Sequence, residues 1–316
     1  MSAQRKTVIL GSGGTIAGTA ADARDNVGYA AARIGVGQLI EAVPALAGEQ
    51  LECEQVAQLD SKDMDFATWQ RLAQRCAHHL GRGDVGGVVV THGTDTLEET
   101  AYFLHRVLAP ADKPLVLTAA MRPATSLAAD GPQNLLDAVA VAQERGVHGV
   151  VAVLAGTVIG AADLRKLHTY RLTAFDAGDA GPIARIEDGR LRVFRPWPGG
   201  TPLGLAPVLR DVAQWPRVEI VVNYAGAGAG VVEALCAQGV QGLVAAGSGN
   251  GSLHRELEGA LHRAQAHGVR VLRASRCALG PVVGGDEVGL PCAGALSAVQ
   301  ARVELLLGLL GEATAR

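Results

Sequence analysis

The sequence predicts an α/β protein with two domains, a larger one built on a mainly parallel sheet with flanking helices and a smaller C-terminal one. Short apolar, β-branched runs alternate with stretches whose apolar residues recur every three or four positions. This order is typical of parallel strands joined by crossover helices. A stretch containing Pro and Gly, residues 196–216, interrupts the order and is predicted to be a linker. We therefore expect an N-terminal domain over residues 1–195 and a C-terminal α/β domain over residues 217–316.

The composition argues against several kinds of partner. A net charge of −3 gives no electrostatic reason to bind nucleic acid or an anionic membrane, and no apolar run approaches the ~20 residues of a membrane helix. The first residues lack the pattern of a secretory signal, which favours a cytoplasmic protein. The five cysteines form no CxxC pair and the nine histidines no HExxH pattern. We therefore expect no metal and no organic cofactor.

The most informative stretch is VVVTHGTDTLEETAYFL, residues 88–104. It opens as a strand buried on both faces and closes as a helix, and Thr96 and Glu99 have the spacing of a capping box. Thr94 and Asp95 fall between strand and helix, at the carboxyl edge where open α/β sheets bind ligands. A hydroxyl beside a carboxylate there suits acid–base chemistry. The alternative is that both residues only cap the helix.

A second strand and turn lie near the N-terminus, where TVIL leads into GSGGTIAG. The glycines allow a tight turn and close approach of a ligand. A dinucleotide fingerprint requires glycine where this chain has Ile16, and a phosphate loop requires a lysine that the turn lacks. What remains is the hydroxyl of Thr15, a candidate nucleophile.

Together GGTIAG and HGTDT resemble the bacterial-type L-asparaginases, threonine amidohydrolases that include the glutaminase-asparaginases. The resemblance covers nearly the whole chain, about residues 7–310. It implies hydrolysis of L-asparagine to L-aspartate and ammonia through a threonine nucleophile, with L-glutaminase as a side activity. The preference between the two amides does not follow from sequence, because one methylene is worth only ~1–3 kcal/mol in a pocket.

The resemblance also assigns catalytic roles. Thr15 is the implied nucleophile, and Lys166 is implied to reach Thr94 and Asp95 in a proton relay. Which threonine performs each covalent step does not follow from the sequence. Residues 19–35 have little apolar periodicity and are expected to form a loop that serves as a lid. Tyr29 of this loop is implied to contact the nucleophile. The alternative for Tyr29 is that it only packs the loop down.

Four further residues match substrate-binding positions of the family. Ser61 is implied to bind the substrate α-carboxylate, with helix capping as its alternative, and Lys62 beside it departs from the Gln or Glu of many relatives. The carbonyl of Ala120 is implied to line the amide pocket, and Ser252 matches a position that varies between Asn and Ser. Glu287 matches a glutamate donated by a neighbouring subunit, or is a solvated loop residue.

The implied role of Glu287 predicts a homo-oligomer, a dimer of dimers, whose active sites are shared between subunits. Two classes of function remain. One is the amidohydrolase acting on the small molecule L-asparagine. The other is a non-catalytic amino-acid sensor, or a subunit of a tRNA-dependent amidotransferase, on the same fold. The enzyme is favoured because a sensor is expected to have lost a catalytic side chain, and none of the matched ones is missing.

The same patterns predict the remaining elements. Helices are expected over residues 36–43, 66–80, 133–144, 231–238 and 253–266, and a last one from Ser297, which forms a capping box with Gln300. Strands are expected over residues 51–59, 114–118, 150–154, 218–222, 242–246 and 269–273, with a hairpin over residues 183–195 that turns at Asp188-Gly189.

Overall fold

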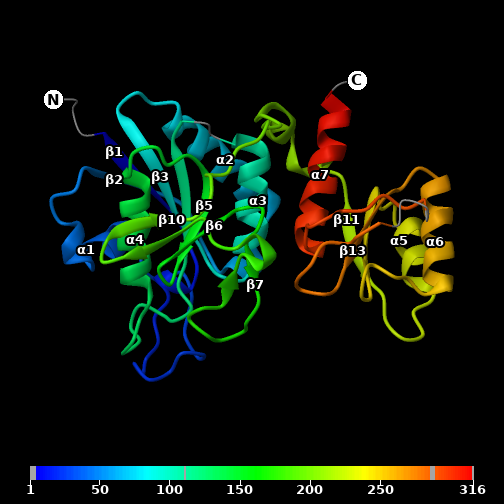
Figure 1. Cartoon of the computed structure of the whole chain (residues 1–316), viewed down its shortest axis with the longest axis horizontal. Helices are drawn as coiled ribbons and strands as arrows, with labels where there is room; N and C mark the ends of the chain where they lie inside the picture. The colour runs from blue at the N-terminus through cyan, green and yellow to red at the C-terminus, as the bar shows by residue number, and fades with distance from the viewer. Residues whose placement is uncertain (1–4, 110–111, 285–288, 315–316) are drawn as a thin grey trace. The chain divides into compact units, whose positions relative to one another are not determined.

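A computed structural model describes residues 5–109, 112–284 and 289–314 of the chain. The chain divides into two compact units, Met1–Leu205 and Ala206–Arg316 (Figure 1). Each unit is a sheet with helices against it. No helix in the described part of the chain is long and apolar enough to cross a membrane.

Unit 1 contains an eight-stranded sheet in the order β10-β9-β6-β5-β4-β3-β1-β2. The five strands from β5 to β2 run parallel, and β6, β9 and β10 extend the sheet with antiparallel pairing. The strands are β1 (Lys6–Gly13), β2 (Leu51–Leu59), β3 (Val85–Thr91), β4 (Pro114–Thr118), β5 (Gly149–Leu154), β6 (Thr157–Gly160), β9 (Ala184–Glu187) and β10 (Arg190–Val193). A separate pair is formed by β7 (Arg165–Lys166) and β8 (Phe175–Asp176).

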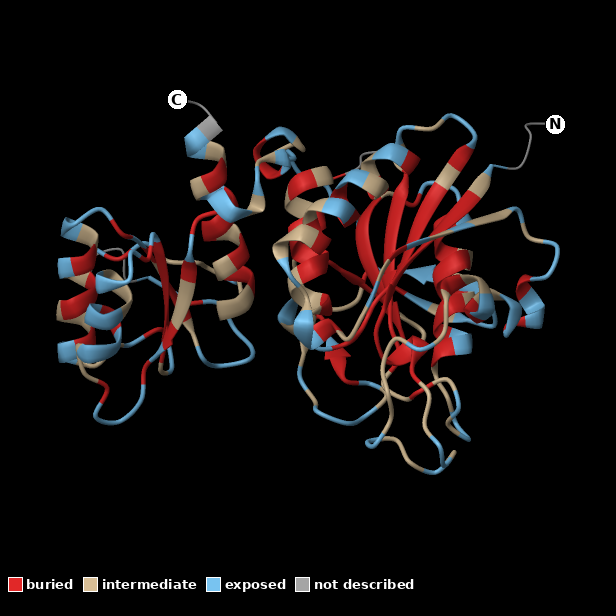
Figure 2. Cartoon of the chain, turned by 180° about the vertical axis from the view of Figure 1, so that it is seen from behind, coloured by how far each residue is buried: buried red, intermediate tan, exposed pale blue. Residues whose placement is uncertain are grey.

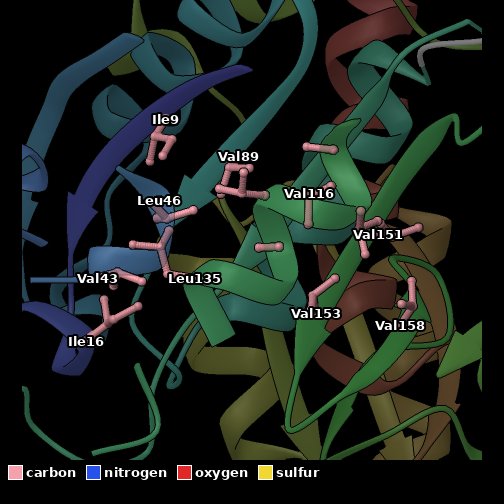
Figure 3. Close-up of a cluster of buried hydrophobic side chains, with 14 of the residues drawn as sticks. Ile9, Ile16, Val43, Leu46, Val89, Val116, Leu135, Val151, Val153 and Val158 are labelled. Atoms are coloured by element: carbon pink, nitrogen blue, oxygen red, sulfur yellow. The ribbon is translucent and has the colours of Figure 1, made fainter. Parts of the chain in front are cut away.

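The core of unit 1 is built by side chains that point alternately to the two faces of the parallel strands. Ile9, Val89, Val116 and Val151 are cross-strand neighbours in adjacent strands, and all belong to one buried cluster that includes Leu135 (Figure 3). Successive side chains of a strand point to opposite faces, so the residues beside these form the opposite face, which is buried as well. Burial on both faces explains why the strands read as continuous apolar runs (Figure 2).

The helices of unit 1 cover both faces of the sheet. Helices α1 and α4 contribute to the cluster around Val116, whereas α2 and α3 contact each other and the strands β3 and β5. The helices are α1 (Val36–Glu41), α2 (Phe66–Leu80), α3 (Leu97–Leu108) and α4 (Gly131–Gln143).

Unit 2 is a smaller three-stranded parallel sheet in the order β11-β12-β13. Helices α5 and α6 share a buried cluster with one face, and α7 contacts all three strands. Its elements are β11 (Val218–Val222), β12 (Gly242–Gly247), β13 (Arg270–Ser275), α5 (Gly230–Ala237), α6 (Arg255–Ala266) and α7 (Ala298–Thr314).

The predicted fold class is confirmed, and most predicted elements lie within a few residues of the observed ones. The capping box at Ser297 and Gln300 is present, with both reciprocal hydrogen bonds at 3.3 Å. The prediction that a helix starts near Thr96 is confirmed, because Thr96 is the N-cap of α3. The capping bond that its spacing to Glu99 suggested is absent: the Thr96 side chain accepts no helical N–H, and its hydroxyl donates to the Ser61 carbonyl at 2.8 Å.

Candidate active site

Four turns meet at the carboxyl edge of the parallel sheet. Ser61, Thr15, Thr94 and Ala120 follow β2, β1, β3 and β4, which are consecutive neighbours in the sheet. Because these strands run parallel, all four turns lie at the same edge. The sheet order therefore gathers residues that are far apart in sequence.

Two of these turns touch through their backbones at Gly14 and Gly93. Gly14 has a φ of +81°, and a Cβ atom there would overlap the backbone of Gly93. A Cβ atom on Gly93 would overlap the side chain of Ser61. Glycine is required at both places, and it brings the chain segments that carry Thr15 and Thr94 into direct contact.

Thr15 opens a short 3-10 helix after β1, and only 7% of its surface is exposed. Its hydroxyl lies 2.6 Å from the hydroxyl of Tyr29, which reaches in from the loop of residues 19–35. Burial raises the pKa of Tyr29, although the hydrogen bond with Thr15 opposes this shift. Tyr29 therefore stays protonated near neutral pH and can share a proton with Thr15.

Lys166 links the second pair of polar residues. Its Nζ atom donates to Thr94 Oγ1 at 2.9 Å and to Asp95 Oδ1 at 2.7 Å. Thr94 is 6% exposed, whereas Asp95 is open to solvent on one side. A cavity of about 340 Å³ lies beside Asp95 and Lys166. An ammonium, a buried hydroxyl and a carboxylate in a row can pass protons to a bound reactant.

A glutamate that sequence reasoning missed positions this lysine. Glu98, in the first turn of α3, accepts the backbone N–H of Lys166 at 2.6 Å. Burial raises the pKa of Glu98, and the bond from Lys166 partly offsets the shift. No sequence pattern indicates this contact, because it joins a helix to a short strand, β7, that was not predicted.

Ser61 is buried at the start of a 3-10 helix after β2. Its hydroxyl accepts the backbone N–H of Asp95 at 3.1 Å, and Asp60 rather than Ser61 caps the 3-10 helix. The capping alternative for Ser61 is therefore wrong. Lys62 points its ammonium at the carboxylate of Asp63 and is largely exposed.

His92 stabilises the turn between β3 and α3. It is fully buried and its Nδ1 donates to the carbonyl of Gly93 at 2.7 Å, while Nε2 has no partner among the described residues. Burial lowers the pKa of His92 to about 4, against the opposing effect of the Gly93 hydrogen bond. The imidazole is thus neutral at physiological pH.

The two remaining predicted substrate-binding residues are Ser252 and Glu287. Ser252 belongs to unit 2, where it forms an isolated antiparallel bridge with Ser248. Glu287 lies outside the described residues. Among the residues that the structure describes, no group of three or more His, Cys, Asp or Glu side chains is arranged to hold a metal ion.

Acyl transfer through a covalent intermediate can use a hydroxyl nucleophile, which needs a route for its proton. Hydroxyl groups and a lysine–carboxylate pair meet these needs at one edge of the unit 1 sheet. Fold and site together define an amidohydrolase of the α/β class.

Comparison with family models agrees with this class. Residues 6–198 match the family described as "Asparaginase, N-terminal", and residues 217–315 match the "Glutaminase/Asparaginase C-terminal domain". The chain belongs to the asparaginase family.

Individual relatives share both sequence and fold with the chain. It is 37% identical over 313 residues to L-asparaginase 2 of Escherichia coli K12, covering 95% of this chain and 88% of that protein. It is 36% identical to the glutaminase-asparaginase of Pseudomonas fluorescens biotype A, covering 87% and 76%. The crystal structure of a probable cytoplasmic L-asparaginase from Campylobacter jejuni superposes with a TM-score of 0.90 at 36% identity, covering 96% of this chain and 95% of the other.

Proposed function

We propose that this protein hydrolyses the side-chain amide of L-asparagine to L-aspartate and ammonia, with L-glutamine as a slower second substrate. The observation that carries the proposal is the pair of hydrogen-bonded groups at the ends of adjacent strands, Thr15 with Tyr29 and Lys166 with Thr94 and Asp95. Membership of the asparaginase family supports the choice of substrate.

The proposed reaction has two steps. Thr15 Oγ1 forms a bond to the amide carbon and gives up its proton; the C–N bond then breaks, and the protonated nitrogen leaves as ammonia. Water next adds to the resulting ester, its C–O bond to Thr15 breaks, and L-aspartate leaves while the hydroxyl regains a proton. Backbone N–H groups stabilise the oxyanion that forms in both steps.

The two hydrogen-bonded groups divide the proton transfers. Tyr29 shares the proton of Thr15, whose hydroxyl it touches. Thr94, Lys166 and Asp95 form the relay that protonates the leaving nitrogen and activates the water. Lys166 is well placed because its Nζ atom bonds both the hydroxyl of Thr94 and the carboxylate of Asp95 and so connects the two groups.

Substrate binding is assigned to the residues around these groups. We propose that Ser61 binds the α-carboxylate and that the carbonyl of Ala120 accepts the amide N–H. Ala120 is fully buried at the end of β4, next to the turn that carries Thr94. Ser252 and Glu287 are proposed to bind the substrate from the second unit, with Glu287 donated by a neighbouring subunit of a homotetramer.

A direct experiment tests the activity. Purified protein is incubated with L-asparagine and, separately, with L-glutamine, and both ammonia and the amino-acid product are quantified under steady-state conditions. Stoichiometric L-aspartate and ammonia support the proposal. Saturable binding of L-asparagine without turnover identifies a sensor instead, and overturns it.

The cellular location is also a proposal. The Campylobacter jejuni structure is described as a probable cytoplasmic enzyme, whereas the Haemophilus influenzae relative is named a probable periplasmic L-asparaginase. We propose a cytoplasmic location. Cell fractionation with an antibody against the protein tests it, and recovery in the periplasmic fraction contradicts it.

A further inference from the structure

The loop that carries Ala120 is held by a carboxylate that neither of the proposed steps uses. We call residues 119–130 the amide-pocket loop. Asp130, at its end, accepts the backbone N–H of Met121 at 2.9 Å and that of Arg122 at 3.0 Å. Asp130 is also the N-cap of α4, yet its side chain caps no N–H of that helix. An aspartate at an N-cap ordinarily stabilises its own helix, and here the carboxylate is directed to the loop instead.

A second side chain, Asn134, completes the anchor one turn into α4. It is 2% exposed, and its Nδ2 donates to the carbonyl of Ala119 at 2.9 Å and to Asp130 Oδ2 at 3.3 Å. Its Oδ1 accepts the N–H of Ala155, in the turn between β5 and β6, at 2.9 Å. One buried amide thus ties together the end of β4, the start of α4 and the next turn along the sheet.

The middle of the same loop is bonded to the lid, residues 19–35. Ala124 donates its backbone N–H to the carbonyl of Gly18 at 2.9 Å, just before the lid begins. Leu127 donates to the carbonyl of Ala23 at 3.0 Å, and the Ser126 hydroxyl donates to Asn26 Oδ1 at 2.7 Å. The lid that carries Tyr29 therefore rests on the loop that carries Ala120.

We propose that Asp130 and Asn134 are positioning residues that set how strictly the site selects the length of its amide substrate. Their bonds hold the backbone on both sides of Ala120, at Ala119 and at Met121, and the loop in turn bonds to the lid, so the space between the amide acceptor and the nucleophile is constant. A loosened loop lets that space lengthen, which favours L-glutamine relative to L-asparagine. This inference rests on the proposed function.

Substitutions at Asp130 test the inference, since this residue is only partly buried and its replacement leaves no cavity in the core. Asp130→Ala removes both acceptors for the loop N–H groups, and Asp130→Asn keeps one of them. The matched control is Asp137→Asn on the same helix, whose carboxylate accepts from Gln133 at 2.8 Å and, among the described residues, makes no hydrogen bond to the amide-pocket loop.

Two measurements separate positioning from a general loss of stability. The first is the ratio of kcat/KM for L-asparagine to kcat/KM for L-glutamine. The enzyme concentration is chosen high enough for turnover of the slower substrate to be measured. We expect Asp130→Ala to lower the ratio about tenfold, the size of a one-methylene discrimination, with a smaller fall in Asp130→Asn and none in Asp137→Asn. The second is hydrogen exchange in residues 119–130 and 19–35, which should accelerate most in Asp130→Ala, less in Asp130→Asn and not in Asp137→Asn.

The possible outcomes decide between the explanations. A merely structural role lowers kcat/KM for both amides equally, leaves the ratio unchanged and overturns the inference. Unchanged exchange in the lid and the loop of Asp130→Ala overturns it as well. Wild-type protein that hydrolyses neither amide overturns the proposed function itself, a failure that is visible before any variant is measured.

Discussion

Lys166 and Thr94 are 72 residues apart in the chain, and the ammonium of one donates to the hydroxyl of the other at 2.9 Å. The same ammonium donates to Asp95, so the lysine is held on two sides. We expect a lysine in this position to act on the groups proposed to move protons, not on the substrate's ends.

Replacing Lys166 should therefore impair the chemical step. For Lys166→Met we expect kcat for L-asparagine to fall by ~10²–10⁴, the usual size of a lost acid–base group, with a much smaller change in KM. The control is Lys6→Met, which removes a lysine paired with Asp84 at the opposite end of β1. A variant that raises only KM shows that Lys166 binds the substrate and contradicts the relay.

The two buried hydroxyl groups should be separately essential. Thr15→Ala and Thr94→Val are each expected to fold normally and to lose nearly all hydrolysis of L-asparagine, since one removes the nucleophile and the other interrupts the relay. Circular dichroism and thermal unfolding check the fold. Thr157→Val, on β6, is the matched control and should retain activity. Near-wild-type turnover in either folded site variant rules out that residue's assignment.

The buried imidazole of His92 predicts a pH dependence of stability. Its pKa is lowered to about 4 in the folded protein, below the ~6.5 of an unfolded chain. As the pH falls, the unfolded chain therefore binds the proton first. The neutral His92 side chain therefore contributes to the free energy of unfolding above pH ~6.5. This contribution is lost as the pH falls toward 4, and the loss is at most roughly 3 kcal/mol.

Urea unfolding between pH 7.5 and 4.5, compared between wild type and His92→Asn, measures this effect. Asparagine keeps a donor for the Gly93 carbonyl but does not titrate, so the variant should lose less stability on acidification. His148→Asn is the matched control, because His148 also contacts a backbone carbonyl, that of Gly146, but is not fully buried. Parallel pH curves for wild type and His92→Asn would argue against the buried neutral imidazole.

Removal of divalent ions should leave activity unchanged. The proposed steps use hydroxyl, ammonium and carboxylate groups of the chain, and the sequence shows no ligand cluster with metal spacing. The measurement is steady-state turnover before and after dialysis against a chelator. Activity that disappears on chelation and returns with zinc or magnesium refutes the proposed mechanism.

Shared active sites predict complementation between two defective chains. Thr15→Ala and Glu287→Ala are expected to be inactive alone, because each lacks one group of the site. Co-expressed with different affinity tags and purified through both, mixed oligomers should recover activity, since one site of each mixed dimer receives both wild-type residues. Full activity of Glu287→Ala alone, or inactive mixed oligomers, counts against the shared site.

Local patterns predicted the elements well where the tertiary environment agreed with them. The strands Leu51–Leu59 and Pro114–Thr118 and the helix Phe66–Leu80 have the predicted bounds. The helix buries residues three and four apart, and every residue of the Pro114–Thr118 strand is buried, as its apolar run indicates. The strand β6 and the short pair β7 and β8 were missed. They have only two to four residues each, too few for a period to show.

The site was predictable only where a residue belongs to a motif. Thr96 shows the limit. Its spacing to Glu99 predicts a capping box, yet its hydroxyl donates to the carbonyl of Ser61, in the turn after β2, and its side chain caps no N–H of the helix. Glu98 and Asn134 were missed because their partners come from other segments of the chain. A local pattern can indicate a helix end, but it contains no information about which distant backbone group will compete for the side chain.

The contact between Gly14 and Gly93 fixes one distance in the candidate site, and the side chains around it do not set that distance. Their backbones meet with no room for a side chain, so the spacing of the turns that carry Thr15 and Thr94 is set by main-chain atoms. Substitutions in the lid and the neighbouring loops can therefore reshape the surroundings of these two hydroxyl groups while the distance between their turns stays constant.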